Sequence, residues 1–311
     1  MRKVRKLFGI NIRYLEYEPE TDKYGGDIYY KWADALQHVT TNYSQIVTDK
    51  EFLVPDLLMK KLEFLENNID YGAVSGTYCH IELKNEKIRL LPLHYNKKSK
   101  IFGSQSNSID RVKGVCDGVN PLIGCTSLFR TEILKKIYQP ILQKNINDCR
   151  FGEYSVGILT PIYTKVAEFN DDTYVYRDVI RKNTSESSSK RYPSLTQYIS
   201  DGVYDMFYDQ FETYISNELG SSDLVKKYVQ KYMLSDPFLY KPKIYTLLPV
   251  SIDKIWSKLP VDIKNIICIC IKSHMRYTKY LPVSKIRSNE KNILDIIEST
   301  QKECSLDLPI I

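Results

Sequence analysis

Hydrophobic and polar positions alternate between strand-like and helix-like spacing along the first part of the chain. Residues 10–14 alternate as a strand does, and apolar side chains then recur every three or four residues over 28–39. A second short strand is predicted at 43–47, and Pro55 suits the first turn of a helix that ends at the asparagine pair 67–68. This strand–helix–strand–helix order predicts an α/β layer.

The middle of the chain continues this alternation. Residues 72–93 predict two strands joined by a turn at 84–87, and the polar stretch 96–121 predicts an irregular loop. The pattern then predicts, in order, a strand at 122–130, a helix at 131–144, a helix that opens after Asp148, and a closing pair of strands around residues 170–172.

The pattern changes after a hydrophilic segment rich in Ser, Lys and Arg, which cannot bury a core. Beyond this segment, apolar residues keep helical spacing from Leu195 to Ile215 and again from Leu224 to Met233. We therefore expect three regions. They are an α/β domain over residues 1–180, a polar linker or loop over 181–193, and a mainly helical region over 194–311.

Composition narrows the class of protein. The 311 residues are 43% hydrophobic, which is enough for a folded globular protein, and a net charge of +6 is only a mild bias towards anionic ligands. Seven cysteines without a framework spacing predict reduced thiols in the cytoplasm. The N-terminus fails as a signal peptide, and no apolar run reaches the roughly 20 residues of a membrane span.

Two carboxylates stand where the strand predicted at 43–47 ends, in the sequence VTDKEFLVP. Residues two apart on a strand point to the same side, so Asp49 and Glu51 could present oxygens to one divalent cation. Solvated charge at a strand end explains the same residues. The motif alone leaves both interpretations open.

The residues around this motif resemble family 2-type nucleotide-sugar glycosyltransferases of the GT-A fold. The segment KWADALQHVTTNYSQIVTDKEFLVPDLLMKKLEFL resembles a helix, a strand that ends in a metal-binding acidic motif, and a helix that begins at proline. CTSLFRTEIL and NDCRFGEYSVGILTPIYTKVAEFNDDTYVYRDV resemble later segments of that family. The resemblance covers roughly residues 10–178 and implies a GT-A-like mixed sheet flanked by helices.

The resemblance also implies a reaction and its residues. Asp49 and Glu51 match the metal positions for Mn²⁺ or Mg²⁺, and Glu153 lies near the position of the catalytic base, with Asp148 as the second choice. In the implied inverting transfer, the base removes a proton from an acceptor hydroxyl, which attacks the sugar as the nucleoside diphosphate leaves. An ordinary acid near a helix N-terminus is the alternative for Glu153.

Two cations complete the implied donor site. Lys31 and Arg177 could contact the phosphates or the sugar of the donor, and Asp49 could also contact the donor, although a solvated surface cation explains either basic residue alone. The expected partners are a nucleotide-sugar donor and a glycan or lipid-linked acceptor. The expected location is the cytoplasm, with peripheral contact at an anionic membrane left open because Lys and Tyr alternate in the C-terminal helices.

Two departures from the family pattern favour a second possible function. Lys50 occupies the middle of the acidic motif, where its positive charge opposes cation binding. The chain also begins after the strand–helix–strand that usually holds the nucleotide base. The alternative is therefore an inactive relative that binds a sugar or a protein partner. Nucleic-acid binding is not expected, because the tyrosines near the lysines keep helical core spacing.

Overall fold

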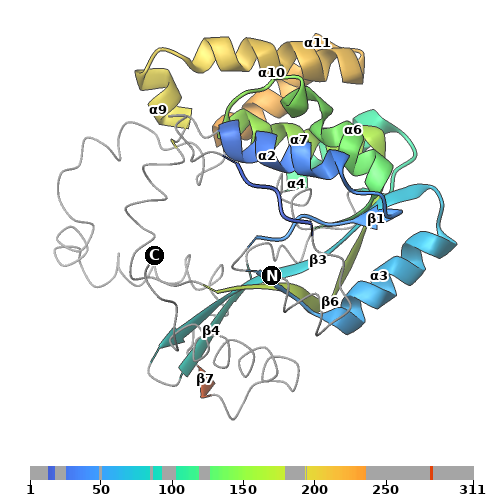
Figure 1. The fold of residues 1–311 in the computed structure, drawn as a ribbon. Coiled ribbons are helices and arrows are strands. Elements are labelled where there is room, and N and C mark those ends of the chain that lie inside the picture. The colour runs from blue at the N-terminus through green and yellow to red at the C-terminus, as the bar shows by residue number, and fades with distance from the viewer. Residues whose placement is uncertain are drawn as a thin grey trace, which may run out of the picture.

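The computed structural model shows a mixed α/β fold followed by a helical region, which confirms the predicted fold class (Figure 1). Helices α2, α4, α6 and α7 cover one face of the sheet, and α3 lies on the other. None of the described helices is long and apolar enough to cross a bilayer. The structure describes residues 13–17, 26–48, 51–84, 87–92, 103–118, 127–178, 193, 195–235 and 281–282.

Strand β3 (Tyr71–Lys84) is the centre of the sheet. It pairs with β6 (Lys165–Asp178) in parallel along one edge, and with β5 (Leu128–Arg130) and β4 (Lys87–Pro92) in antiparallel fashion along the other. The β3–β4 pairing confirms the predicted hairpin. Three short strands extend the sheet: β1 (Tyr43–Ser44) beside β5, β2 (Glu51–Leu53) beside β6, and β7 (Leu281–Pro282) beside β4.

One predicted feature of the sheet is wrong. Residues 165–178 form a single strand, rather than two strands that turn back at 170–172. Both halves of β6 run along β3. On β3, the neighbouring residues Gly76 and Thr77 pair with Phe169 and Thr173 of β6. Residues 170–172 therefore have no register partner on β3 and form a bulge.

The helices predicted in the first part of the chain are confirmed, and one is added. Pro55 starts α3 as predicted, and the Asp148 side chain caps α7. The predicted irregular loop contains helix α4, and residues 13 and 14 are not in a strand. The bounds are α2 (Gly26–Gln37), α3 (Pro55–Asn67), α4 (Ser108–Gly118), α6 (Thr131–Leu142) and α7 (Cys149–Tyr163).

The helices after residue 194 are shorter than the apolar pattern predicts. Gly202 and Gly220 have positive φ angles of 70° and 74°, which an L side chain rarely adopts, and each one follows the end of a helix. The bounds are α9 (Leu195–Ser200), α10 (Tyr204–Leu219), α11 (Ser222–Leu224), the π-helix η1 (Val225–Gln230) and α12 (Lys231–Ser235). Apart from Pro193, the predicted linker at 181–193 lies outside the described residues.

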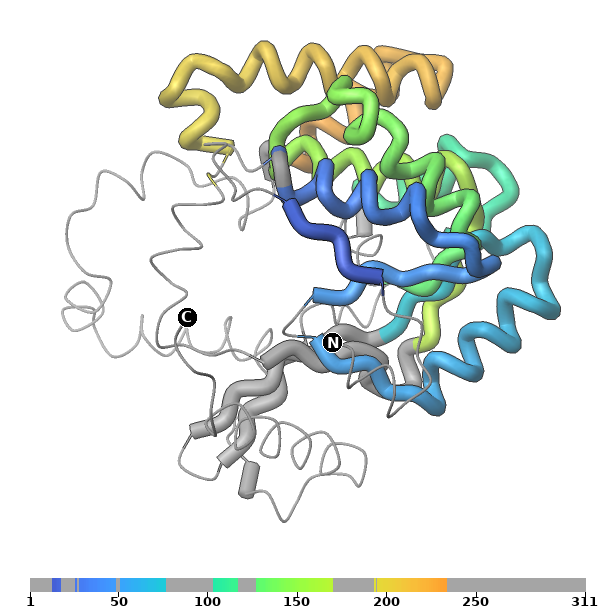
Figure 2. The backbone as a smooth tube through the Cα atoms, in the orientation of Figure 1, coloured from blue at the N-terminus to red at the C-terminus, as the bar shows by residue number. Residues whose placement is uncertain are grey.

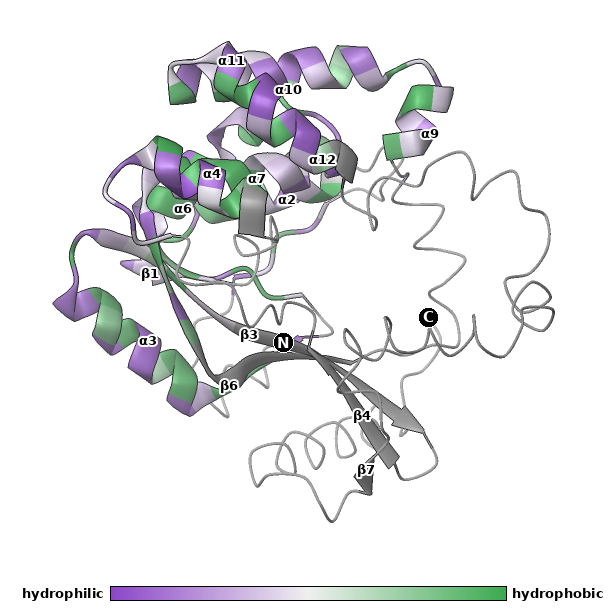
Figure 3. Cartoon of the chain, turned by 180° about the vertical axis from the view of Figure 1, so that it is seen from behind, coloured by the Kyte–Doolittle hydropathy of each residue, from purple (hydrophilic) through white to green (hydrophobic). Residues whose placement is uncertain are grey.

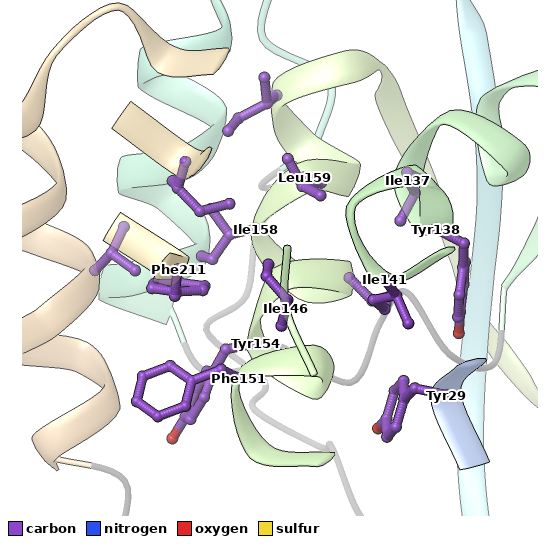
Figure 4. Packing of buried hydrophobic residues seen from close by; sticks show 14 of the residues in the cluster. Tyr29, Ile137, Tyr138, Ile141, Ile146, Phe151, Tyr154, Ile158, Leu159 and Phe211 are labelled. Atoms are coloured by element: carbon purple, nitrogen blue, oxygen red, sulfur yellow. The ribbon is translucent and has the colours of Figure 1, made fainter. Parts of the chain in front are cut away.

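Helix α7 lies at the centre of the main core, and residues from the helices around it pack against its sides (Figures 2 and 4). Phe151 on this helix contacts the rings of Tyr198, Phe207 and Phe211. Hydrophobic residues alternate with hydrophilic ones along α3 and α10, as an amphipathic helix requires (Figure 3). The α/β part and the C-terminal helices thus share one hydrophobic core.

Candidate functional site

Glu51 is the first residue of strand β2. The Glu51 carboxylate oxygen Oε2 accepts a hydrogen bond from the Thr48 backbone N–H at 2.9 Å, and the Glu51 N–H donates to the Thr48 carbonyl at 3.1 Å. The strand predicted up to residue 47 ends at Ser44. Asp49 and Lys50 lie outside the described residues. The Glu51 side chain therefore helps to hold the backbone that precedes β2.

The sheet brings a predicted metal ligand, Glu51, next to a predicted donor-binding residue, Arg177. Strand β2 pairs with β6 in antiparallel fashion, and Glu51 lies directly opposite Arg177. Residues that face each other in such a pair have Cα atoms roughly 4.5–5.5 Å apart. On its other side, Arg177 is in register with His80 of β3. Positions 51, 177 and 80 thus form one row across three strands, although sequence spacing gave no sign of it.

The described residues do not by themselves fit the predicted metal ion. No group of three His, Cys, Asp or Glu side chains in the described part of the chain is placed to hold one. One oxygen of Glu51 already accepts a backbone hydrogen bond. A single carboxylate is a poor site for Mn²⁺ or Mg²⁺, which take several oxygen ligands. Because Asp49 lies outside the described residues, the metal site stays a prediction.

Asp148, the second choice for the base, serves as the N-cap of α7. Its Oδ1 atom accepts hydrogen bonds from the backbone N–H groups of Arg150 and Phe151 at 2.9 and 2.8 Å. The hydroxyl of Tyr198 donates to the same oxygen at 3.2 Å. Burial, and then the nearby charge of Asp148, raise the pKa of Tyr198, which keeps this hydroxyl a donor. The carboxylate is 1% exposed and ties α9 to α7.

Glu153, the first choice for the base, is paired with a cation of its own helix. Its Oε2 lies 3.3 Å from Nη1 of Arg150, and the Arg150 Nε donates to the Pro193 carbonyl at 2.8 Å. Burial is the largest single effect and lowers the pKa of Arg150, but Glu153 and the weaker interactions with neighbouring groups together outweigh it, so the net change is upward. Glu153 lies on α7, whereas Glu51 lies on strand β2 of the sheet.

Lys31 contacts the N-terminal segment. Its Nζ lies 5.9 Å from the centre of the Tyr17 ring, and the Tyr17 hydroxyl donates to Oδ2 of Asp34 at 2.6 Å. Burial, followed by the hydrogen bond to Asp34, raises the pKa of Tyr17 to about 12. These contacts hold residues 13–17 against α2. They give Lys31 a structural role in addition to the predicted one.

The sequence did not single out Lys61, which is buried between α3 and the sheet. The side chain is 1% exposed, and its Nζ lies 5.9 Å from the centre of the Phe169 ring. Burial lowers the pKa of Lys61 to about 7, against the attraction of Glu168. A sequence signal did exist, because Lys61 stands at helical spacing between Leu58 and Leu65 on the apolar stripe of α3.

No protein-family profile matches the chain, and a search of curated proteins gives no significant match. The candidate site therefore rests on the residues and on their geometry.

Proposed function

We propose that this chain is a glycosyltransferase-like protein that transfers a sugar from a nucleotide-sugar donor to a hydroxyl group of a glycan or a lipid-linked acceptor. The observation that supports the proposal most directly is the register of β2 and β6, in which Glu51 faces Arg177. The family resemblance assigned Glu51 to the metal ion and Arg177 to the donor, from separate segments of the sequence. Their meeting on neighbouring strands is what a shared donor site requires.

Arg177 is the residue to which we assign the diphosphate of the donor. A guanidinium group is permanently charged and can give two parallel hydrogen bonds to phosphate oxygens. Such bonds strengthen as negative charge develops on the leaving diphosphate, so they favour the transition state over the bound substrate. The nearby Glu51 would orient the donor through its hydroxyl groups.

The proposed transfer needs one proton acceptor. The base takes the proton of the acceptor hydroxyl, the hydroxyl oxygen forms a bond to the anomeric carbon, and the bond from that carbon to the diphosphate oxygen breaks. The electron pair of the broken bond stays on the diphosphate. Glu153 is the better candidate for the base, because Asp148 is buried and holds two N–H groups of α7. Glu153 must leave Arg150 to act.

The first experiment measures donor binding. The full chain is titrated calorimetrically with nucleoside diphosphates and nucleotide sugars, with and without Mn²⁺. We expect Arg177→Gln to weaken binding by about 10- to 100-fold, as the loss of a charged hydrogen bond predicts, and Glu51→Gln to weaken it less. Lys60→Gln and Glu63→Gln, at exposed positions on α3, are the matched controls. A folded chain that binds none of these nucleotides contradicts the proposal.

A second experiment separates the two candidate bases. If Glu153 is the base, Glu153→Gln lowers the rate of nucleotide release by about 10²- to 10⁴-fold and leaves donor binding intact. Asp148→Asn should change the rate only a few-fold, because an asparagine oxygen also caps a helix. The reverse result would assign the base to Asp148.

An inactive relative that binds a sugar or a protein partner remains the second candidate function. Three of the predicted catalytic or metal-binding carboxylates already stabilise the fold in the structure. Glu51 bonds to Thr48, Asp148 caps α7, and Glu153 pairs with Arg150. Donor binding without measurable transfer to any hydroxyl acceptor or to water would favour this function.

A further inference from the structure

The helices after Gly202 form a hairpin whose two arms run in opposite directions. The first arm is α10, and the second is the continuous run of α11, η1 and α12; we call residues 204–235 the helical hairpin (Figures 1 and 3). Gly220 makes the turn in a left-handed conformation. An ion pair of 3.4 Å between Glu212 of α10 and Lys226 of η1 sets the register of the arms.

The exposed faces of the two arms carry opposite charge. Asp205 and Asp209 are exposed on α10, and Lys227 and Lys231 are exposed on the second arm. Each pair is spaced by four residues, so each forms a stripe along its own helix. Within the described part of the chain, none of these four residues makes an ion pair. The acidic and basic stripes thus keep their charges for a partner.

Both stripes begin close to the Glu212–Lys226 ion pair. From the Glu212–Lys226 pair, α10 runs back towards Asp205 while the second arm runs on towards Lys231. A helix rises about 1.5 Å per residue, so both stripes begin within about 5 Å of the pair and continue in the same direction. Met206, on the acidic side, is 51% exposed and adds an apolar contact point.

We infer that the helical hairpin is an interaction surface for a second copy of this chain. A two-fold axis parallel to the hairpin would lay α10 of each copy against η1 and α12 of its partner. Asp205 and Asp209 then face the partner's Lys231 and Lys227, and the same contacts repeat on the other side of the axis. A surface that carries both charges in parallel stripes is self-complementary, which is what a two-fold interface requires.

The charge pattern favours a second copy over a bilayer or a nucleic acid. An anionic bilayer and a nucleic acid both have a negative surface potential, so they would attract Lys227 and Lys231 but repel Asp205 and Asp209. The interface is small. The 16 residues of α10 span ~24 Å and two helices are ~20 Å wide, so each copy would bury on the order of 500 Å². That size predicts a weak dimer whose formation depends on concentration and salt.

The test is a charge exchange followed by sedimentation equilibrium of the full chain. At high protein concentration and low salt, the measured mass of the wild type should approach twice the chain mass of 36.3 kDa. High salt should lower it to the mass of a single chain. Two variants reverse one stripe each: Asp205→Lys/Asp209→Lys and Lys227→Glu/Lys231→Glu. Each alone should be monomeric. An equimolar mixture of the two should dimerise again, because every contact across the axis then joins opposite charges.

The control has the same kind of charge change elsewhere. Glu63→Lys, at an exposed position on α3, should dimerise like the wild type. Circular dichroism checks that every variant is folded, and neutral Asp205→Asn/Asp209→Asn replaces the reversed variant if that one unfolds; it should be monomeric too. A wild type that is monomeric at all concentrations overturns the inference, even if it binds anionic vesicles or RNA. A dimer that both reversals leave unchanged overturns it as well.

Discussion

Replacing Lys61 with methionine should stabilise the protein at neutral pH. The Lys61 ammonium lies in the layer between α3 and the sheet, with 1% of the side chain exposed. Burial lowers the pKa of Lys61 from 10.5 to about 7. The Lys61 amine therefore binds a proton more weakly in the folded chain than in the unfolded chain. Methionine has a similar length and no charge, and it fills the same space without that conflict.

The size of the effect follows from the two pKa values of Lys61. Below about pH 7 both folded and unfolded chains hold the proton, and folding carries the full cost of burying it. Between about 7 and 10.5 only the unfolded chain is protonated, so stability rises with pH. Each unit of difference between the folded and unfolded pKa values corresponds to ~1.4 kcal/mol of stability. The full difference for Lys61 therefore lowers the free energy of unfolding by roughly 4–5 kcal/mol at or below neutral pH. The gain from Lys61→Met should therefore shrink as the pH approaches 10.

Urea unfolding followed by circular dichroism between pH 6 and 9.5 measures this gain. The exposed neighbour Lys60 provides the matched control, since Lys60→Met should change the free energy of unfolding by less than ~0.5 kcal/mol at every pH. The reasoning is refuted if Lys61→Met destabilises the protein at neutral pH. A gain that is the same at pH 6 and at pH 9.5 refutes it too, because the gain would then not come from the proton.

Three further substitutions test contacts that hold the fold, each by urea unfolding. Asp148→Ala should lower the free energy of unfolding by ~2–3 kcal/mol because it removes the α7 cap, and Asp148→Asn should restore most of it. Arg111→Met should cost on the order of 3 kcal/mol, since the buried guanidinium donates to four backbone carbonyls; a loss below 1 kcal/mol would contradict this. Gly72→Ala should cost ~1–3 kcal/mol, because its Cβ would overlap the Thr164 side chain, and shortening that residue to alanine should recover part of the loss.

Elements with a local signal could be predicted from the sequence. Pro55 marks the first turn of α3, and Asp148 has the side chain that caps α7, so both helices begin where the pattern places them. The β3–β4 hairpin also follows from nearby residues, because its strands are joined directly. These signals act within a few residues, where propensity and capping decide the structure.

Features that depend on distant partners could not be predicted. The polar residues 170–172 predict a turn. In the structure, β6 pairs with β3 both before and after these residues, which form a bulge within one strand. Strand β1 has two residues, Tyr43 and Ser44, which pair with Arg130 and Phe129 of the distant strand β5. Helix α4 escaped prediction because its inward face includes the charged Arg111 beside apolar Val112 and Val115.

Some features of the candidate site could likewise be predicted from the sequence, and others could not. The resemblance could nominate Glu51 and Arg177, but their register depends on the long-range pairing of β2 with β6. It could not predict that Glu153 pairs with Arg150, or that the Asp148 cap also bonds to Tyr198 of α9. The Tyr198 contact needs α9 to be packed against α7, whereas the Glu153–Arg150 pair forms within α7 itself.

The pairing of β2 with β6 also determines when the candidate donor site can form during synthesis. Strand β2 leaves the ribosome early, yet its described partner ends at Asp178, more than a hundred residues later. Until that segment emerges, Glu51 has no Arg177 beside it, and the backbone of β2 lacks its β6 partner. Such non-local pairing slows folding and exposes strand edges to other chains in the meantime. A stalled or truncated chain that ends before β6 would thus lack the candidate donor site and would also be prone to aggregation.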